Sequence, residues 1–87
     1  LVNVSRGSVV DEAALVGVLS DGGLGGAGLD VFADEPRVPA KFIAMENVIL
    51  APHVGSATPE TRAAMTDLAI ANMHAYLAGR PLLTPVP

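Results

Sequence analysis

The sequence predicts an α/β fold in which a parallel sheet carries helices on its outside. Short apolar runs at 1–4, 24–31 and 48–51 are typical of strands. Apolar residues at helical spacing follow the first run, within 11–21, and the third run, from residue 59 onward. Successive strands joined by a helix or a long connection pair in parallel, so the order of the elements predicts a parallel sheet.

The first strand leads through a turn into a helix. We expect the strand at 1–4 to end before a turn at 5–7. Asp11 is suited to cap the helix N-terminus, and Glu12 places negative charge in the first turn, where it suits the helix dipole. The pair Gly22-Gly23 then ends the helix.

The middle of the chain contributes two more strands and a long connection. The run at 24–31 is rich in small residues, and Pro36 and Pro39 interrupt the segment 32–47, which we expect to be mostly loop. The run at 48–51 is continuously apolar, as strands that are covered on both faces are. Together these elements correspond to the later half of a doubly wound nucleotide-binding sheet.

The last element is a long helix with clear boundaries. Thr58 is a suitable N-cap, Pro59 occupies the favoured first helical position, and Gly79 with Pro81 ends the run. Six side chains fall near one face of this helix: Met65, Leu68, Ala69, Asn72, Met73 and Tyr76.

The composition is unusually apolar for so short a chain. Of its 87 residues, 51% are hydrophobic and 16% are charged, whereas soluble domains have roughly 25% charged residues. A small body has proportionally more surface to solvate and needs more charge, not less. We therefore expect the chain to be part of a larger protein whose other part covers much of this apolar surface.

The charge and the absence of cysteine exclude several classes of protein. The net charge is −4 and the five Lys and Arg residues are dispersed, which argues against nucleic-acid binding. The chain has no Cys, so disulfide frameworks and thiolate metal sites are excluded. No stretch approaches the roughly 18 uninterrupted apolar residues of a membrane helix. We expect a cytoplasmic protein that binds neither nucleic acid nor membrane.

A glycine pattern in the chain matches a phosphate-binding motif without its context. The segment 23–28 matches the dinucleotide fingerprint G-x-G-x-x-G letter for letter. That motif works where its glycines follow a strand and open a helix. Here the predicted helix precedes the glycines and a strand follows them. We expect these glycines to end a helix and allow close packing, not to bind phosphate.

Three side chains of different chemistry each follow one of the apolar runs: Arg6, Glu35 and His53. The carboxyl ends of parallel strands meet at one edge of a sheet, where ligands bind. A carboxylate beside an imidazole orients it and stabilises its protonated form, which makes the imidazole a general acid. A guanidinium holds a carboxylate and stabilises a carbonyl oxygen that gains charge. This set is what the reduction of a small keto acid needs.

Asp30 also lies at the end of its predicted strand. A buried carboxylate there needs hydrogen-bond donors, and a nicotinamide carboxamide supplies them. The alternative is that Asp30 binds backbone amides of the following loop.

Each of the other three residues also has an ordinary structural alternative. Arg6 could be a surface residue or pair with Asp11 at the helix start. Glu35 could lie in a solvated turn, and His53 could be a partly buried side chain satisfied by backbone.

Three blocks of the sequence resemble the D-isomer-specific 2-hydroxyacid dehydrogenases. They are Val-Asn-Val-Ser-Arg-Gly-Ser-Val-Val-Asp, Gly-Leu-Asp-Val-Phe-Ala-Asp-Glu-Pro and Ala-Pro-His-Val-Gly-Ser-Ala-Thr. The resemblance extends from Leu1 to about Pro87, with all three blocks in order. Asp-Glu-Pro-Arg-Val-Pro and the tail Gly-Arg-Pro-Leu-Leu-Thr-Pro-Val-Pro look like the glyoxylate and hydroxypyruvate reductase branch.

The resemblance implies a role for each of these residues. Arg6 would bind the substrate carboxylate and carbonyl, His53 would donate the proton, and Glu35 would be its partner. Asp30 would contact the nicotinamide of NADP or NAD, and the residues lining the cofactor would be Val4, Ser5, Arg6, His53, Gly55 and Ser56. The substrate would be a small 2-keto or 2-hydroxy acid, and the intact protein a homodimer.

The resemblance also implies a division of the chain. Residues 1–58 would be the C-terminal part of a Rossmann-type dinucleotide-binding domain. Residues 59–87 would be a helix and tail that return to a substrate domain, most of which this chain lacks. We expect that the 87-residue chain alone neither binds cofactor well nor turns over substrate.

Two other functions use the same residues. A regulatory module of this fold would use them to sense a dinucleotide without turnover. A hydrolase would use Ser5 or Ser56 with His53 and Glu35, but the chain has no G-x-S-x-G elbow.

Overall fold

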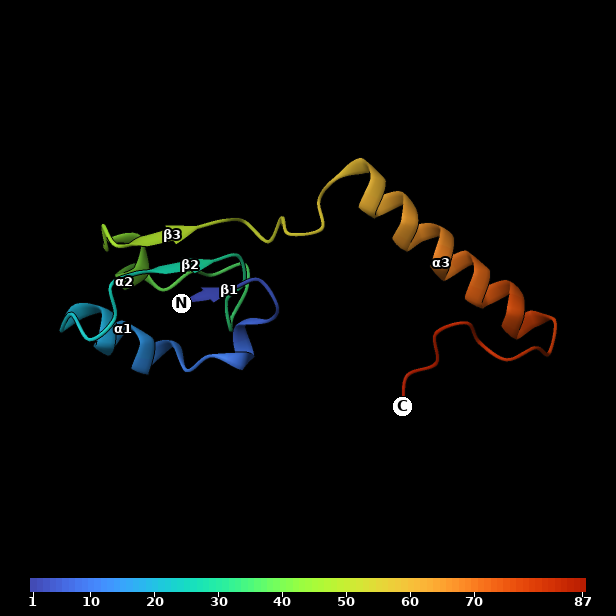
Figure 1. Cartoon of the computed structure of the whole chain (residues 1–87), viewed down its shortest axis with the longest axis horizontal. Helices are drawn as coiled ribbons and strands as arrows, with labels where there is room; N and C mark the ends of the chain where they lie inside the picture. Colours follow the sequence, from blue (N-terminus) through green and yellow to red (C-terminus); the bar gives the residue numbers. More distant parts are fainter. The chain divides into compact units, whose positions relative to one another are not determined.

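The structure of the chain, a computed structural model, describes residues 1–87 and falls into two compact units (Figure 1). The first unit is Leu1–Gly55 and the second is Ser56–Pro87.

The first unit is built on a three-stranded parallel sheet. Strands β1 (Val2–Asn3), β2 (Ala27–Leu29) and β3 (Val48–Leu50) lie side by side in the order β1-β2-β3. All pairs are parallel, which confirms the predicted sheet. The second strand is much shorter than the predicted 24–31, because backbone pairing to β1 and β3 ends where those short neighbours end.

One face of this sheet is covered within the first unit. Ala27 and Leu29 point to the covered face and are buried. On the other face Gly28 lies between Val2 and Ile49, whose exposed fractions are 77% and 76%. The expected coverage of the third strand on both faces is therefore not present within this unit.

Helix α1 (Glu12–Ser20) forms as the sequence predicts. Asp11 caps it, with its carboxylate accepting from the backbone N–H of Ala14 at 3.0 Å. The helix ends before Gly22, whose φ of 79° is a conformation that glycine adopts at little cost. The segment 23–28 then connects α1 to β2 and opens no helix, so it lacks the context of a phosphate-binding loop.

A short helix that the sequence analysis missed completes the core. The segment 32–47 was expected to be mostly loop, but α2 (Ala40–Ile43) begins directly after Pro39. Its Phe42 is fully buried and joins the core formed by Leu15, Leu19, Ala27, Leu29 and Phe32. A four-residue helix has too few turns to produce a helical period, so only its burial distinguishes it from loop.

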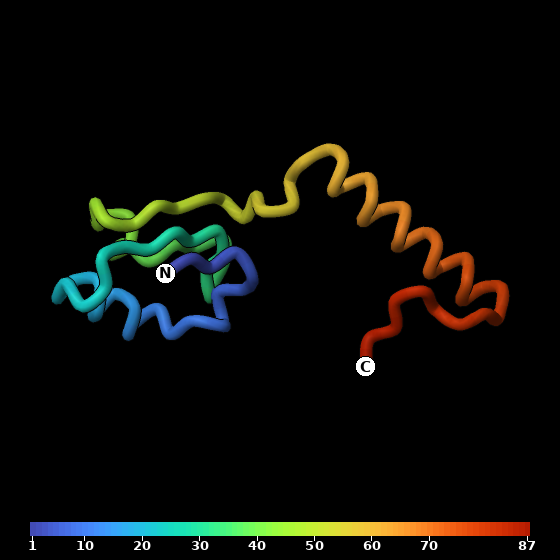
Figure 2. Tube along the Cα trace, in the orientation of Figure 1, coloured from blue at the N-terminus to red at the C-terminus, as the bar shows by residue number.

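The second unit consists of helix α3 (Pro59–Leu77) and the tail that follows it. Thr58 caps the helix, with its hydroxyl accepting from the N–H of Thr61, and Pro59 begins it, as predicted. After Gly79, at φ 65°, the tail turns back beside the helix (Figure 2). The amide oxygen of Asn72 accepts from the N–H of Leu83 at 2.9 Å, which holds the tail there.

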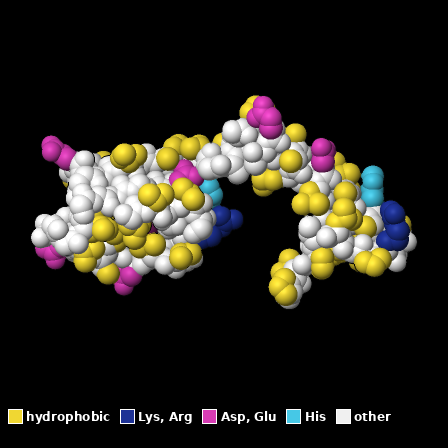
Figure 3. All heavy atoms as spheres, viewed as in Figure 1, with side chains coloured by type: hydrophobic (Ala, Val, Ile, Leu, Met, Phe, Trp, Pro, Cys, Tyr) yellow, Lys and Arg dark blue, Asp and Glu magenta, His cyan; other side chains and the backbone are white.

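Much of the apolar surface of α3 is exposed (Figure 3). The large exposed side chains of this helix are Met65, Leu68, Ile70, Met73, Tyr76 and Leu77. None of the helices is both long enough and apolar enough to cross a membrane.

Candidate active site

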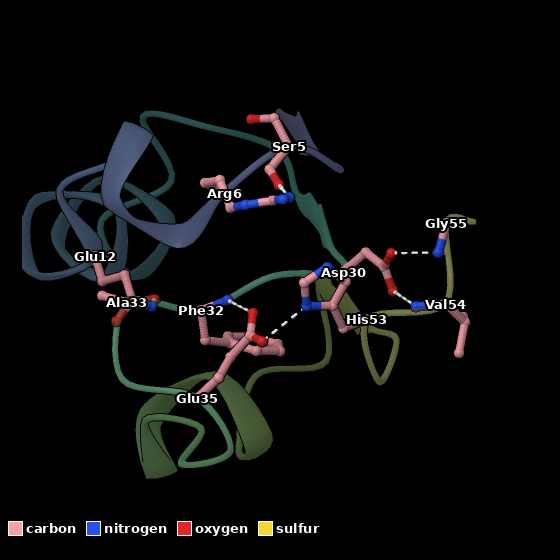
Figure 4. Close-up of polar contacts among 10 residues, drawn as sticks. All are labelled: Ser5, Arg6, Glu12, Asp30, Phe32, Ala33, Glu35, His53, Val54 and Gly55. Atoms are coloured by element: carbon pink, nitrogen blue, oxygen red, sulfur yellow. Dashed lines mark hydrogen bonds and ion pairs between the residues drawn. The ribbon is translucent and has the colours of Figure 1, made fainter. Parts of the chain in front are cut away.

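The loops that follow the three strands meet at the carboxyl edge of the sheet (Figure 4). They carry Arg6 after β1, Glu35 after β2 and His53 after β3. Parallel pairing places these ends together, as the sequence analysis assumed.

Glu35 and His53 form a direct pair. The Nδ1 atom of His53 lies 2.7 Å from Oε2 of Glu35 (Figure 4). The other carboxylate oxygen, Oε1, accepts from the N–H of Phe32 at 3.0 Å. The hydrogen bond to His53 lowers the pKa of Glu35 most, and the Phe32 amide and the charge of Arg6 lower it further. Glu35 is therefore an oriented carboxylate that stays ionised, and the imidazole is fixed by it.

The backbone at His53 adopts an uncommon conformation. Its φ is 54°, in the left-handed region that residues with a Cβ seldom occupy. Such a conformation persists where its surroundings hold it in place. With this backbone conformation, the imidazole of His53 contacts Glu35.

Asp30 holds the loop that carries His53. It is buried, with an exposed fraction of 6%. Its two oxygens accept from the N–H groups of Val54 at 2.8 Å and Gly55 at 2.7 Å (Figure 4). The bond from Val54 is the main reason that the pKa of Asp30 is lowered. Asp30 thus binds backbone amides, as one of the two alternatives stated. These amides belong to the loop that carries His53, however, and not to the loop that follows β2.

Arg6 lies at the start of a short 3-10 helix, η1 (Gly7–Val9), and is exposed. Its guanidinium donates to the carbonyl oxygen of Ser5 at 2.6 Å. It forms no ion pair with Asp11, whose carboxylate caps α1. The helix-capping ion pair is therefore absent, and the charge of Arg6 acts on Glu35 instead.

Asn3 supports the Arg6 loop, and the sequence analysis missed it. Its side-chain oxygen accepts from the N–H of Ser5 at 3.1 Å and from the Ser5 hydroxyl at 2.9 Å. Its side-chain nitrogen donates to the carbonyl oxygen of Arg6 at 3.0 Å. The signal that could have found it is an Asn inside an apolar strand, since a buried amide needs partners.

The remaining predicted residues have different surroundings. Val4 is two-thirds exposed, so its apolar side chain is available at the edge. Gly55 lies against Asp30, where a Cβ would approach Oδ2 to 3.1 Å. Ser56 begins the second unit. The Ser5 hydroxyl donates to Oδ1 of Asn3 at 2.9 Å and not to the imidazole of His53, so Ser5 lacks the hydrogen bond to a base that a hydrolase nucleophile needs.

An apolar cavity of about 340 Å³ opens beside the Glu35–His53 pair. Its lining is formed by Phe32, Glu35, Pro36, Val38, Leu50, Ala51, Pro52 and His53. The side chains of His53 and Glu35 are still 44% and 35% exposed, so water reaches the pair from the open side of the cavity.

The sequence profile of the D-isomer specific 2-hydroxyacid dehydrogenase NAD binding domain matches residues 1–55. The chain belongs to this family. The matched region coincides with the first unit of the structure, which carries Arg6, Asp30, Glu35 and His53.

Similar proteins and solved structures support the same family. The hydroxyphenylpyruvate reductase of Plectranthus scutellarioides is 58% identical over 86 residues, which are 99% of this chain. The glyoxylate/hydroxypyruvate reductase A of Arabidopsis thaliana is 55% identical over the same length. The crystal structure of the NADPH-dependent glyoxylate/hydroxypyruvate reductase of Sinorhizobium meliloti, in complex with NADP and malonate, matches 99% of this chain with a TM-score of 0.94 at 53% identity.

This chain of the 2-hydroxyacid dehydrogenase family spans about 28% of the length of the two plant enzymes and about 27% of the bacterial one. The fold of the first unit is thus a Rossmann-type half sheet.

Proposed function

We propose that this chain supplies the proton-donating and substrate-holding side of an oxidoreductase that reduces a small 2-keto acid to the D-2-hydroxy acid with NADPH or NADH. The observation that carries the proposal is the 2.7 Å pair of His53 and Glu35, with Arg6 at the same edge of the sheet. The reaction is that of a whole enzyme, because this chain spans only about 28% of the length of its two plant relatives.

Each of the three side chains has a distinct task. Arg6 offers a planar fork of donors to the substrate carboxylate and to the carbonyl oxygen. Glu35 accepts the Nδ1–H bond of His53, so the proton on Nε2 points away from the pair and is available to the carbonyl oxygen. Transfer of that proton to the reduced carbonyl leaves a neutral imidazole and an alcohol.

The residues at this edge fit a nicotinamide. The carboxylate of Asp30 accepts one bond at each oxygen, and each oxygen has a further lone pair for the amide group of a nicotinamide. The exposed apolar side chain of Val4 suits the face of a ring. When bound, the reduced nicotinamide supplies the hydride to the carbonyl carbon. We propose that Ser5, Gly55 and Ser56 line the same cofactor.

The relatives support the choice of substrate and cofactor. The names of the similar plant enzymes specify hydroxyphenylpyruvate, glyoxylate and hydroxypyruvate, and the similar bacterial structure holds NADP. We propose hydroxypyruvate and glyoxylate as the first substrates to test. We also propose a cytoplasmic homodimer in which 1–58 belongs to the cofactor-binding domain and 59–87 packs on the substrate domain.

A graft tests this function directly. The chain replaces the aligned segment of the Sinorhizobium meliloti reductase, which it matches over 99% of its own length. We call this protein the grafted enzyme. We expect it to oxidise NADPH with hydroxypyruvate or glyoxylate. A folded grafted enzyme that binds NADPH without any turnover would favour a regulatory module that only senses the dinucleotide.

A further inference from the structure

Glu12 makes a long-range contact that the proposed reaction does not use. It is the first residue of α1, where Asp11 already serves as the cap. The Glu12 side chain leaves the helix, and its Oε1 accepts from the backbone N–H of Ala33 at 2.8 Å. The contact joins residues 21 positions apart in the chain. A bond from an amide to a carboxylate is stronger than one between neutral groups.

The amide that Glu12 holds is next to the amide that Glu35 holds. Glu35 accepts from the N–H of Phe32, and Glu12 accepts from the N–H of Ala33 (Figure 4). Two carboxylates, from α1 and from the loop after β2, therefore fix two consecutive amides. Ala33 is two residues before Glu35, and Glu35 itself bonds the amide of Phe32, so a shift of this peptide would move Glu35 relative to His53.

Gly7 packs directly against the peptide that joins Phe32 and Ala33. A Cβ on Gly7 would lie 1.9 Å from the carbonyl carbon of Phe32 and 2.3 Å from the nitrogen of Ala33. The backbone of η1 therefore lies against this peptide, directly after Arg6. The peptide cannot move towards η1, and any movement away from α1 would break the hydrogen bond to Glu12.

We propose that Glu12 is a positioning residue for the Glu35–His53 pair, acting through the backbone amide of Ala33. Its importance for turnover rests on the proposed function, but its effect on the geometry of the pair does not. The charged side chains that face Glu35 are His53 and Arg6, so Glu12 acts through the backbone and not by direct contact with the pair.

The test is a titration of the Glu35 carboxyl carbon by NMR in the 87-residue chain and three variants at position 12. Glu12→Ala removes the acceptor, Glu12→Asp keeps the charge but shortens the reach, and Glu12→Gln keeps the oxygen without the charge. We expect the pKa of Glu35 to rise towards its usual value of 4.5 in the Ala and Asp variants. We expect Glu12→Gln to titrate like the original chain.

The outcomes distinguish an effect of the contact between Glu12 and Ala33 from an effect of the charge of Glu12. If Glu35 titrates unchanged in both Glu12→Ala and Glu12→Asp, Glu12 does not position the pair. If Asp preserves the titration and Gln does not, the charge matters and the contact with Ala33 does not, which also overturns the proposal. Should Glu12→Ala fail to fold, the Asp and Gln variants decide between the same outcomes. Glu60→Ala is the matched control, since Glu60 is an exposed first-turn acid of α3, and it should leave the titration of Glu35 unchanged.

Discussion

At the scale of single residues, the site depends on His53, which two carboxylates hold in place. Glu35 holds the imidazole from its side chain, and Asp30 holds the backbone just after it. The sequence predicted which side chains gather here, because parallel strands bring their carboxyl ends together. It did not predict the φ of 54° at His53 or the contacts of Asn3 and Glu12, because these depend on tertiary contacts that no local pattern encodes.

Removal of the Glu35 charge should weaken turnover without abolishing folding. In the grafted enzyme, Glu35→Gln keeps the size of the side chain but leaves His53 without an ionised partner. We expect kcat to fall by about 10²-fold, within the range that positioned proton transfer contributes. The measurement is kcat at saturating NADPH, with Asp34→Asn as the control, since Asp34 forms only an exposed ion pair with Arg37. An unchanged kcat would remove Glu35 from the mechanism.

The two carboxylates should also make stability depend on pH in acid. The pKa values of Asp30 and Glu35 are lowered from 3.8 and 4.5 in the folded chain. The unfolded chain then binds more protons in this range, so their contribution is fully present above the usual values and is lost as pH falls through the lowered ones. Urea unfolding of the chain from about pH 6 to about pH 2 should show this loss. Substitution of both by Asn and Gln should flatten the dependence. If the double variant loses as much unfolding free energy in acid as the original chain, other groups cause the loss.

At the scale of elements, the loop after β3 should tolerate little change at Asp30, which binds the amides of Val54 and Gly55. Asp30→Asn keeps one acceptor oxygen but replaces the other with an amide donor that faces a backbone N–H. We expect kcat of the grafted enzyme to fall by roughly 10²-fold, because small displacements of a reacting group have large effects. The affinity for NADPH, measured by fluorescence titration, separates this effect from a loss of cofactor contact. A fall in affinity with unchanged kcat would instead support Asp30 as a nicotinamide ligand only.

Two glycines offer a contrast between close packing and helix propensity. Gly7→Ala places a Cβ within 1.9 Å of the Phe32 carbonyl carbon, so η1 must move away from the loop that carries Glu35. Gly17→Ala meets nothing within 4 Å and lies inside α1. We expect Gly17→Ala to stabilise the chain by about 0.5–1 kcal/mol and Gly7→Ala to destabilise it clearly. Urea unfolding measures both, and equal effects would contradict the packing seen at Gly7.

The helices show where sequence patterns are sufficient. Capping residues and glycines predicted both ends of α1 and of α3, because each signal acts locally. Helix α2 was missed, because its four residues are held by the burial of Phe42 and not by a period. The strands were predicted in the right places, but β2 was predicted too long, since its neighbours determine where pairing stops.

At the scale of the whole molecule, the exposed apolar surface limits what this chain does alone. Val2 and Ile49 are each about three-quarters exposed on one sheet face, and α3 exposes a row of large apolar side chains. The chain also spans about 28% of the length of its plant relatives. We expect the 87-residue chain to bind NADPH weakly and to show no reduction of hydroxypyruvate. Turnover by a preparation whose intact mass is that of the chain would contradict this.

The most direct test of the central claim is kcat of the grafted enzyme with His53→Gln, measured with hydroxypyruvate alongside its affinity for NADPH. The glutamine retains hydrogen-bonding groups but cannot donate a proton as an imidazolium does. If His53 is the proton donor, kcat falls by about 10²–10⁴-fold while the NADPH affinity stays within about twofold. An unchanged kcat would show that His53 is not the proton donor.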